Sequence, residues 1–239
     1  MKNLFLLLFT SSILFLSCKK DNGSQKGSSE VDIYIVGREN TSVQCWKNGE
    51  KLFDNSCIIY NTIGTAVAVK NNDVYISGGI DNVAAYWKNG VITELGNRLT
   101  NSSANGIYFS GNDMYVTGME ISVPSNARAG YWKNGVFTKL TEVFGDARGL
   151  AVSGSDVYIA GNDLDTAVYW KNGQKFTLEK GIATDVKVVD GDVYISGYLP
   201  INQGNATIVY WKNGVKNIVE TATSQYTSLE AYAIAVVKK

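Results

Sequence analysis

Short runs of β-branched and aromatic residues alternate with turns rich in Asn and Gly along most of the chain. In one well-defined group the runs cover residues 66–69, 73–77, 84–88 and 91–95. Runs of this composition, bounded by turn residues, predict four short β-strands. Asn89-Gly90 alone separates the last two runs, which predicts a type I′ turn and therefore antiparallel neighbours.

The whole group recurs with a period of about 40 residues. Asp-x-Tyr-x-x-Gly starts the second run of each group, and Trp-Lys-Asn-Gly closes the third, at Trp46, Trp87, Trp132, Trp170 and Trp211. Four antiparallel strands per repeat, arranged radially, make a β-propeller blade. The sequence therefore predicts an all-β fold, a five-bladed β-propeller of four-stranded antiparallel blades.

The two ends of this array complement each other. The first group opens directly on Asp32 and lacks a first strand, whereas residues 231–236 resemble a first strand with nothing after it. We expect the C-terminal strand to join the N-terminal blade and close the ring, with an open solenoid as the alternative.

The first 18 residues have the pattern of a bacterial lipoprotein signal. Lys2 supplies a positive charge, residues 4–16 are mostly apolar, and Cys18 follows the small Ser17. We expect Cys18 to be lipidated, and an ordinary cleaved secretory signal is the alternative. This predicts a protein held at the bacterial outer membrane by its lipid alone, periplasmic or surface-exposed.

Residues 19–30 are polar and have no apolar period, so we expect a flexible tether. Residues 31–239 remain for the propeller, a usual length for one all-β domain.

Charge and composition exclude several function classes. The chain has 22 Lys and Arg and 22 Asp and Glu, so its formal net charge is zero and gives no reason to expect nucleic-acid binding. The absence of His excludes Ser-His-Asp catalysis and His-based zinc sites. We expect no cofactor, metal site or catalytic residue. If Asn48-Gly49 forms a tight turn, Cys45 and Cys57 are poorly positioned for a disulfide, although a disulfide between them remains an alternative.

The repeated side chains are expected to be structural. We interpret each Trp as packing between blades, with ligand stacking as the alternative, and each repeated Tyr as a cross-strand packing partner. The repeated Asp is expected to cap its own turn. Residues 162–165 place oxygen ligands close together, but they lack the full calcium-loop pattern.

Candidate binding residues follow from loop lengths. The connections at one end of the predicted ring vary in length, while those at the other end are constant. Binding residues concentrate on loops held by a rigid scaffold, so we place a ligand site at the variable end. Larger residues replace small ones within the first strands at Tyr108, Asp185 and Lys187. The residues at the loop-side entry of these strands form a rim and complete the candidates: Thr65, Asn105, Arg148, Thr184 and Tyr232. Asp185 and Lys187 share one side of a strand and could pair.

The lipoprotein signal combined with Asp-Val-Tyr-x-x-Gly and Tyr-Trp-Lys-Asn-Gly-Val resembles repeat lipoproteins of Bacteroidota. The resemblance covers nearly the whole chain and implies no activity. In blade number the chain is similar to the five-bladed tachylectin-type sugar-binding propellers, whose repeat motif it does not share.

Three functions are therefore considered. The first is a non-catalytic binding module for a glycan or a partner protein, attached to the membrane only through its lipid anchor. The second is an interaction scaffold in an outer-membrane assembly. The third is a glycoside-active enzyme, in which Asp146 or Glu230 would act with Asp185, and the regularity of the repeats disfavours it. Loops with no ligand remain the alternative to all three.

Overall fold

The computed structural model describes residues 32–39, 42–53, 62–122, 126–200, 206–222 and 229–237. The chain divides into two units, Met1–Asp32 and Ile33–Lys239, and all the described strands belong to the second unit. The expected signal, lipidated Cys18, tether and Cys57 lie outside the described residues. Within the described ranges, no helix has the length and hydrophobicity needed to span a membrane.

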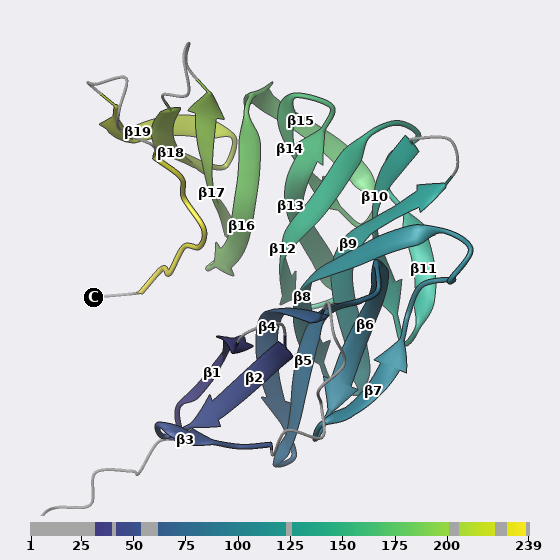
Figure 1. Cartoon of the computed structure of the whole chain (residues 1–239). Helices are drawn as coiled ribbons and strands as arrows, with labels where there is room; N and C mark the ends of the chain where they lie inside the picture. The colour runs from purple at the N-terminus through teal and green to yellow at the C-terminus, as the bar shows by residue number, and fades with distance from the viewer. Residues whose placement is uncertain are drawn as a thin grey trace, which may run out of the picture. The chain divides into compact units, whose positions relative to one another are not determined.

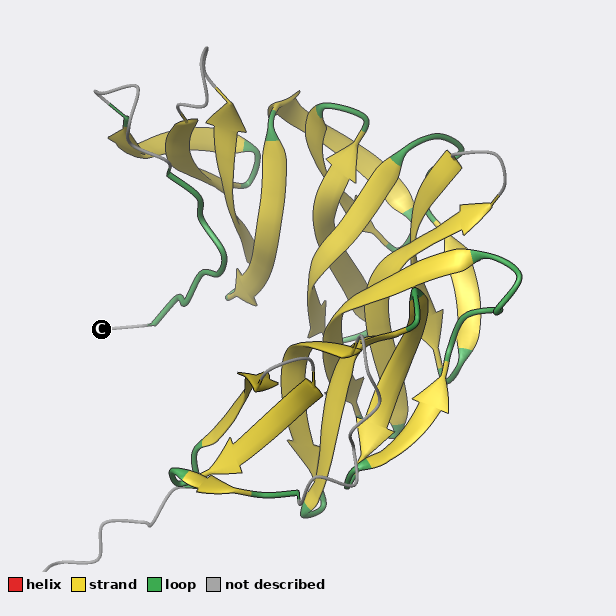
Figure 2. Cartoon of the chain, in the orientation of Figure 1, coloured by secondary structure: helices red, strands yellow, loops and turns green. Residues whose placement is uncertain are grey.

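The second unit is all-β, and its strands form five antiparallel sheets in chain order (Figures 1 and 2). The first sheet has three strands: β1 (Tyr34–Glu39), β2 (Ser42–Lys47) and β3 (Glu50–Lys51). The second has β4 (Thr62–Lys70), β5 (Asp73–Ile80), β6 (Val83–Lys88) and β7 (Val91–Glu94). The third has β8 (Asn101–Ser110), β9 (Asp113–Ser122), β10 (Asn126–Lys133) and β11 (Val136–Lys139). The fourth has β12 (Gly145–Ser153), β13 (Asp156–Asp163), β14 (Thr166–Lys171) and β15 (Gln174–Lys180). The fifth has β16 (Ile182–Val189), β17 (Asp192–Pro200), β18 (Ala206–Lys212) and β19 (Val215–Thr221).

The predicted strands and hairpins of the repeats are confirmed, apart from the C-terminal strand expected at residues 231–236. In the second to fifth sheets the Asn-Gly pair joins the third strand to the fourth, and in the first sheet it joins β2 to β3; both residues of each pair have positive φ. Asn89, for example, has φ 49° and Gly90 has φ 84°. Asn adopts this left-handed region more readily than most residues, and Gly does so without steric cost, so the dipeptide sets the turn.

The repeated Asp, Lys, Asn and Tyr form a polar cluster that we call the clamp. In the second sheet Lys88 Nζ lies 2.7 Å from Asp73 Oδ2, and Asn89 Nδ2 donates to Asp73 Oδ1 at 2.7 Å. Asn89 Oδ1 accepts from Val74 N at 2.8 Å. Lys88 Nζ also lies 5.5 Å from the centre of the Tyr75 ring. The clamp therefore ties the second strand to the hairpin between the third and fourth.

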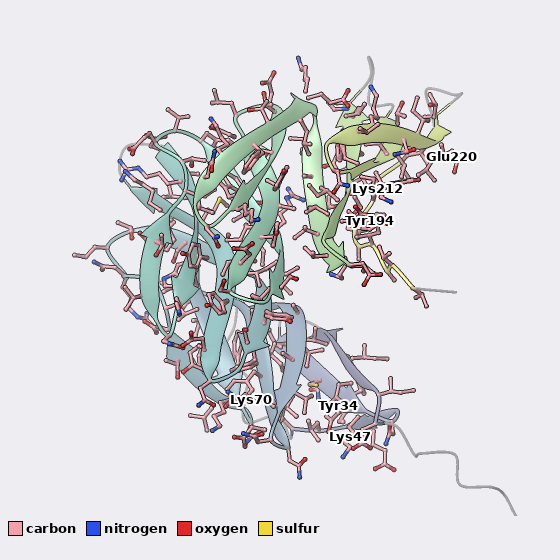
Figure 3. All side chains as sticks on the ribbon, turned by 180° about the vertical axis from the view of Figure 1, so that it is seen from behind. Tyr34, Lys47, Lys70, Tyr194, Lys212 and Glu220 are labelled. Carbon is pink, nitrogen blue, oxygen red and sulfur yellow. The ribbon has the colours of Figure 1, made fainter. Side chains whose placement is uncertain are left out.

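Equivalent clamps form around Asp113, Asp156 and Asp192. In Figure 3, Lys212 lies beside Tyr194 in the fifth sheet. The repeated Asp thus does not cap its own turn as predicted, because its carboxylate is engaged across the sheet. The adjacent Lys ammonium, and then the Asn amide, lower the pKa of Asp73.

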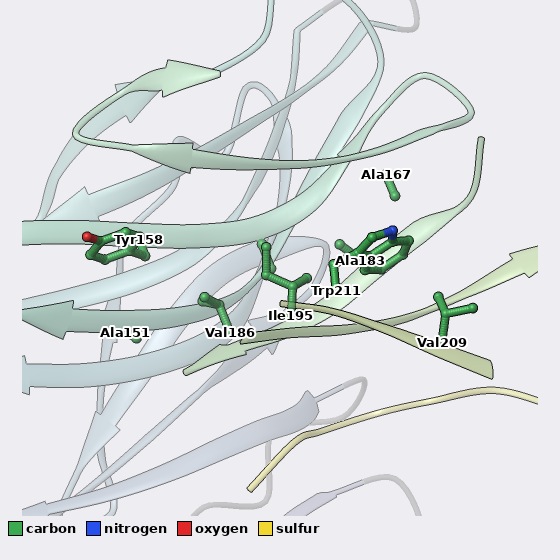
Figure 4. Packing of buried hydrophobic residues seen from close by; sticks show 9 residues of the cluster. Ala151, Tyr158, Ala167, Ala183, Val186, Ile195, Val209 and Trp211 are labelled. Atoms are coloured by element: carbon green, nitrogen blue, oxygen red, sulfur yellow. The ribbon is translucent and has the colours of Figure 1, made fainter. Parts of the chain in front are cut away.

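Each sheet has a front face, which carries the repeated Trp, and a back face, which carries the repeated Tyr. Trp132 is 1% exposed and packs with Ala84 and Ala104, so the front of the third sheet lies on the back of the second. Figure 4 shows the same arrangement for Trp211, which packs with Ala167. The prediction that the Trp side chains pack between blades is confirmed for the second to fifth sheets.

The two ends of the array differ from the prediction. In the described part of the chain β1 is paired on one side only, with β2, and residues 229–237 belong to no strand. The amide of Ile234 donates instead to Asp185 Oδ2 at 3.2 Å, which holds this segment beside β16. Five antiparallel sheets are therefore present, but the expected pairing that closes the ring is not.

Candidate functional site

A β-bulge interrupts the first strand in each of the second to fifth sheets. The register with the second strand shifts at Thr65, at Asn105, at Arg148 with Gly149, and at Thr184. A bulge bends its strand and redirects a side chain, and bulges are common beside functional sites. Four of the predicted binding residues occupy these bulges, so the irregular backbone sets the direction of their side chains.

A cavity of about 610 Å³ is bordered by β4, β8, β12, β16 and the C-terminal segment. This volume lies within the range of small-ligand pockets. The structure brings all the predicted binding residues together around it: Thr65, Asn105, Tyr108, Arg148, Thr184, Asp185, Lys187 and Tyr232.

Three of these residues are engaged in holding neighbouring strands. Thr65 Oγ1 donates to Ala104 O at 2.9 Å, across to the third sheet. Asn105 Nδ2 donates to Ala147 O at 2.8 Å, across to the fourth. Thr184 Oγ1 lies 3.0 Å from Ser196 Oγ, and the residue is buried. Their polar groups therefore shape the cavity wall more than they offer free hydrogen bonds.

The two aromatic candidates are more accessible. Tyr108 is 37% exposed and Tyr232 is 78% exposed. The Tyr232 hydroxyl donates to Glu230 Oε2 at 2.6 Å, and this hydrogen bond raises the pKa of Tyr232. Exposed Tyr rings offer an apolar surface with a polar tip, which suits contact with a sugar ring or a peptide.

Asp185 and Lys187 form the pair expected from the sequence. Lys187 Nζ lies 2.7 Å from Asp185 Oδ2. Asp185 Oδ1 accepts from Val186 N at 2.8 Å, and its other oxygen accepts from Ile234 N. Gly149 permits the close approach of β12 at this point, since a Cβ there would lie 2.4 Å from the Asp185 Cα. Asp185 thus anchors both a cation and the C-terminal segment.

Asp146 belongs to the cavity although it was not among the predicted binding residues. Its side chain is only 16% exposed, accepts from Asn105 Nδ2 at 2.6 Å and lies 3.1 Å from Arg148 Nε. Burial raises the pKa of Asp146, and the Arg148 charge opposes that shift. The sequence analysis named Asp146 only as a candidate catalytic carboxylate, and its contact with Arg148, two residues later on the same strand, becomes apparent only once the bulge is known.

The oxygen-rich turn at residues 162–165 is occupied by ion pairs. Asp163 Oδ2 lies 2.6 Å from Lys175 Nζ, and Asp165 Oδ2 lies 3.3 Å from Lys180 Nζ. No cluster of three or more His, Cys, Asp or Glu side chains suited to a metal ion occurs among the described residues. Cys45 is a free, buried thiol whose pKa is raised by burial.

Comparison with known proteins gives distant structural likenesses only. No family model and no curated protein matches the sequence. The designed protein Ika8 is 15% identical over 87% of this chain and 76% of its own, with a TM-score of 0.45. A chain of the mitotic checkpoint complex is 8% identical over 95% of this chain and 90% of its own, with a TM-score of 0.42. The designed protein Ika4 is 18% identical over 64% of this chain and 94% of its own, with a TM-score of 0.34. These scores are too low to identify a fold, so the architecture rests on the strand pairings themselves.

Proposed function

We propose that this chain is a cell-envelope lipoprotein whose β-domain acts as a non-catalytic binding module for a glycan or a partner protein. The proposed site is the cavity bordered by β4, β8, β12 and β16. An interaction scaffold in an outer-membrane assembly would use the same surface. The lipoprotein part of the proposal, including its placement among repeat lipoproteins of Bacteroidota, is supported by the signal-like residues 1–18 and the repeated Trp-Lys-Asn-Gly.

One observation carries the proposal of binding. Most side chains on the strands that border the cavity are small and recur from repeat to repeat. Four large side chains that depart from the repeat nevertheless line the same cavity: Tyr108, Arg148, Lys187 and Tyr232. Packing of the strands does not require two exposed aromatic rings and two cations around one cavity. A few placed polar groups beside aromatic surface are typical of ligand sites.

We also propose that the five sheets close into a five-bladed ring. Ile35 on the front of the first sheet is 56% exposed, and Val219 on the last sheet is 61% exposed. In the fourth sheet the counterpart of Val219 is Leu178, which packs against the neighbouring sheet. The counterparts of Ile35 are at most 2% exposed: Ile76, Val116, Ile159 and Ile195. Packing of the first sheet on the last would cover both ends, and residues 231–236 would supply the missing strand of the first sheet.

The test of binding is a glycan array and a membrane-extract capture, both performed with the full-length protein purified in detergent. A specific ligand should be lost in Tyr232→Ala and Arg148→Ala. It should persist in Val136→Ala, because Val136 is an exposed hairpin residue away from the cavity. No reproducible ligand in either experiment, or one indifferent to both cavity substitutions, would reject the site.

Glycoside hydrolysis is the second candidate, because the same cavity contains two carboxylates in different environments. Asp146 is buried with a raised pKa, whereas Asp185 is ion-paired with Lys187. A raised pKa suits a general acid. Release of reducing sugar that disappears in both Asp146→Asn and Asp185→Asn would favour this activity over simple binding.

A further inference from the structure

A second hollow adjoins the candidate site. It has a volume of about 430 Å³ and lies among the third, fourth and fifth sheets. Asp146 and Arg148 line both hollows, so the two spaces share a wall. Most other side chains of the second hollow are apolar: Met119, Phe144, Leu164, Ile182 and Pro200.

Leu164 adopts a backbone conformation that its residue type disfavours. Its φ is 56°, and every other described non-glycine residue with positive φ is Asn or Asp. In the second sheet the same hairpin uses Asp81 and Asn82, which tolerate this region well. A Leu there is strained, and such strain is concentrated at functional sites.

The strain at Leu164 is not compensated by burial of its side chain. Leu164 is 57% exposed, and the neighbouring Phe144 is 50% exposed. The two are joined by a hydrogen bond from Leu164 N to Phe144 O at 2.7 Å. Two exposed apolar side chains, Phe144 and Leu164, thus line the hollow, where a partner would remove them from water.

Arg148 adds a charge at the shared wall. In the described part of the chain its guanidinium has one polar partner, Asp146, reached through Nε. A guanidinium has five N–H donors in a planar fork, so its outer nitrogens can still receive a carboxylate. The other charges around the two hollows are already paired, Asp185 with Lys187 and Asp165 with Lys180.

We propose that the two hollows form one bipartite site for a polypeptide segment that carries an apolar side chain next to a carboxylate. This inference rests on the proposed binding function and selects a protein ligand over a glycan. The apolar side chain would enter beside Phe144 and Leu164, and the carboxylate would meet Arg148. A glycan would leave the exposed Phe144 and Leu164 without a matching surface.

The experiment is selection of a phage-displayed library of random peptides on the full-length protein, followed by binding assays on the selected peptides. We expect the peptides to share an aliphatic or aromatic residue beside Asp, Glu or a free C-terminus. Leu164→Asn should weaken them about tenfold or more. The variant should fold at least as well as the wild type, because Asn accepts positive φ and the backbone hydrogen bonds are retained.

Leu99→Asn is the matched control, since Leu99 is 83% exposed and lines neither hollow. Selected peptides that lack the apolar and acidic pair, or that bind Leu164→Asn and wild type equally, would overturn the inference. A glycan ligand lost in Tyr232→Ala but unaffected by Leu164→Asn would also overturn it, while leaving the proposed binding function intact. If neither peptide nor glycan binds, both proposals fail.

Discussion

The Asn of each Trp-Lys-Asn-Gly turn has two separable roles, one conformational and one as a hydrogen-bonding group. Asn134 has φ 50°, accepts from Met114 N at 2.9 Å and donates to Asp113 Oδ1 at 2.8 Å. Asn134→Ala loses both hydrogen bonds and strains the turn, so we expect it to lower the free energy of unfolding by about 2 kcal/mol. Asn134→Gly loses only the hydrogen bonds and should cost about 1 kcal/mol. Urea unfolding of the two variants measures the difference, and equal losses would mean that the backbone conformation contributes nothing.

Two kinds of carboxylate should make opposite contributions to the dependence of stability on pH. The pKa of Asp146 is raised in the folded protein, so its contribution is complete below its unfolded pKa and is lost as pH rises through the folded pKa. Relative to Asp146→Asn, the wild type should therefore lose stability as pH rises above about 4. The pKa of Asp113 is lowered by Lys133 and Asn134, so its contribution is present above about pH 4 and is lost as pH falls. Denaturant unfolding of the wild type, Asp146→Asn and Asp113→Asn at several pH values tests this. The difference in free energy of unfolding between the wild type and each variant should change with pH in opposite directions for the two variants, and changes of the same sign would contradict the prediction.

At the residue scale the sequence identified the cavity side chains better than their partners. Tyr108 and Lys187 were recognisable because they replace small residues of the repeat, and Arg148 and Tyr232 because they stand where the first strands begin. The role of the repeated Asp was misjudged, because its partners Lys and Asn lie more than a dozen positions away and meet it only across the paired strands. Asp146 was named only as a candidate catalytic carboxylate and not as a binding residue, since its burial depends on the neighbouring sheet.

At the scale of single elements, the strands and their hairpins follow from local chemistry. The predicted run 73–77 became β5, and the run 91–95 became β7, with differences of a few residues at their ends. The bulges at Thr65 and Thr184 were not predictable, because a bulge changes the pairing register without changing the alternation of residue types enough to be recognised. The direction of the cavity side chains could therefore be inferred only from the structure.

Packing of one sheet on the next depends on the repeated Trp. Trp132 is 1% exposed, and its ring lies 4.9 Å from that of Phe137. Trp132→Ala should lower the free energy of unfolding by about 3–5 kcal/mol, because it leaves a large cavity between two sheets. Thermal unfolding measures this loss, and Val136→Ala is the exposed control on the adjacent hairpin. A melting temperature of Trp132→Ala equal to that of the control would show that the side chain does not support the packing.

At the scale of the whole molecule, the number and order of sheets followed from the repeat, but closure of the ring did not. Local pairing is encoded within each repeat, whereas the proposed closure would join the two ends of the chain and would require residues 231–236 to leave Asp185 for β1. The exposed Ile35 makes closure testable. In a closed ring, Ile35→Asn should cost about 2 kcal/mol or more, because it places a polar group in an apolar contact.

Val91→Asn is the control for closure, since Val91 is 70% exposed on a hairpin within the array. Urea unfolding should separate the two variants if the ring is closed. Equal and negligible effects of Ile35→Asn and Val91→Asn would show that the front of the first sheet faces solvent, and the array would then be an open solenoid.

The clamp has a consequence for how such chains change over evolutionary time. Its ion pair and hydrogen bonds, as between Asp156, Lys171 and Asn172, all lie within one sheet. A duplicated repeat therefore brings all the polar partners of its clamp with it, and a deleted repeat leaves no unpaired clamp residue in its neighbours. Because the front and back faces also recur, a gained or lost copy meets surfaces that already fit. The gene can thus gain or lose whole repeats without breaking the clamp of any repeat that remains.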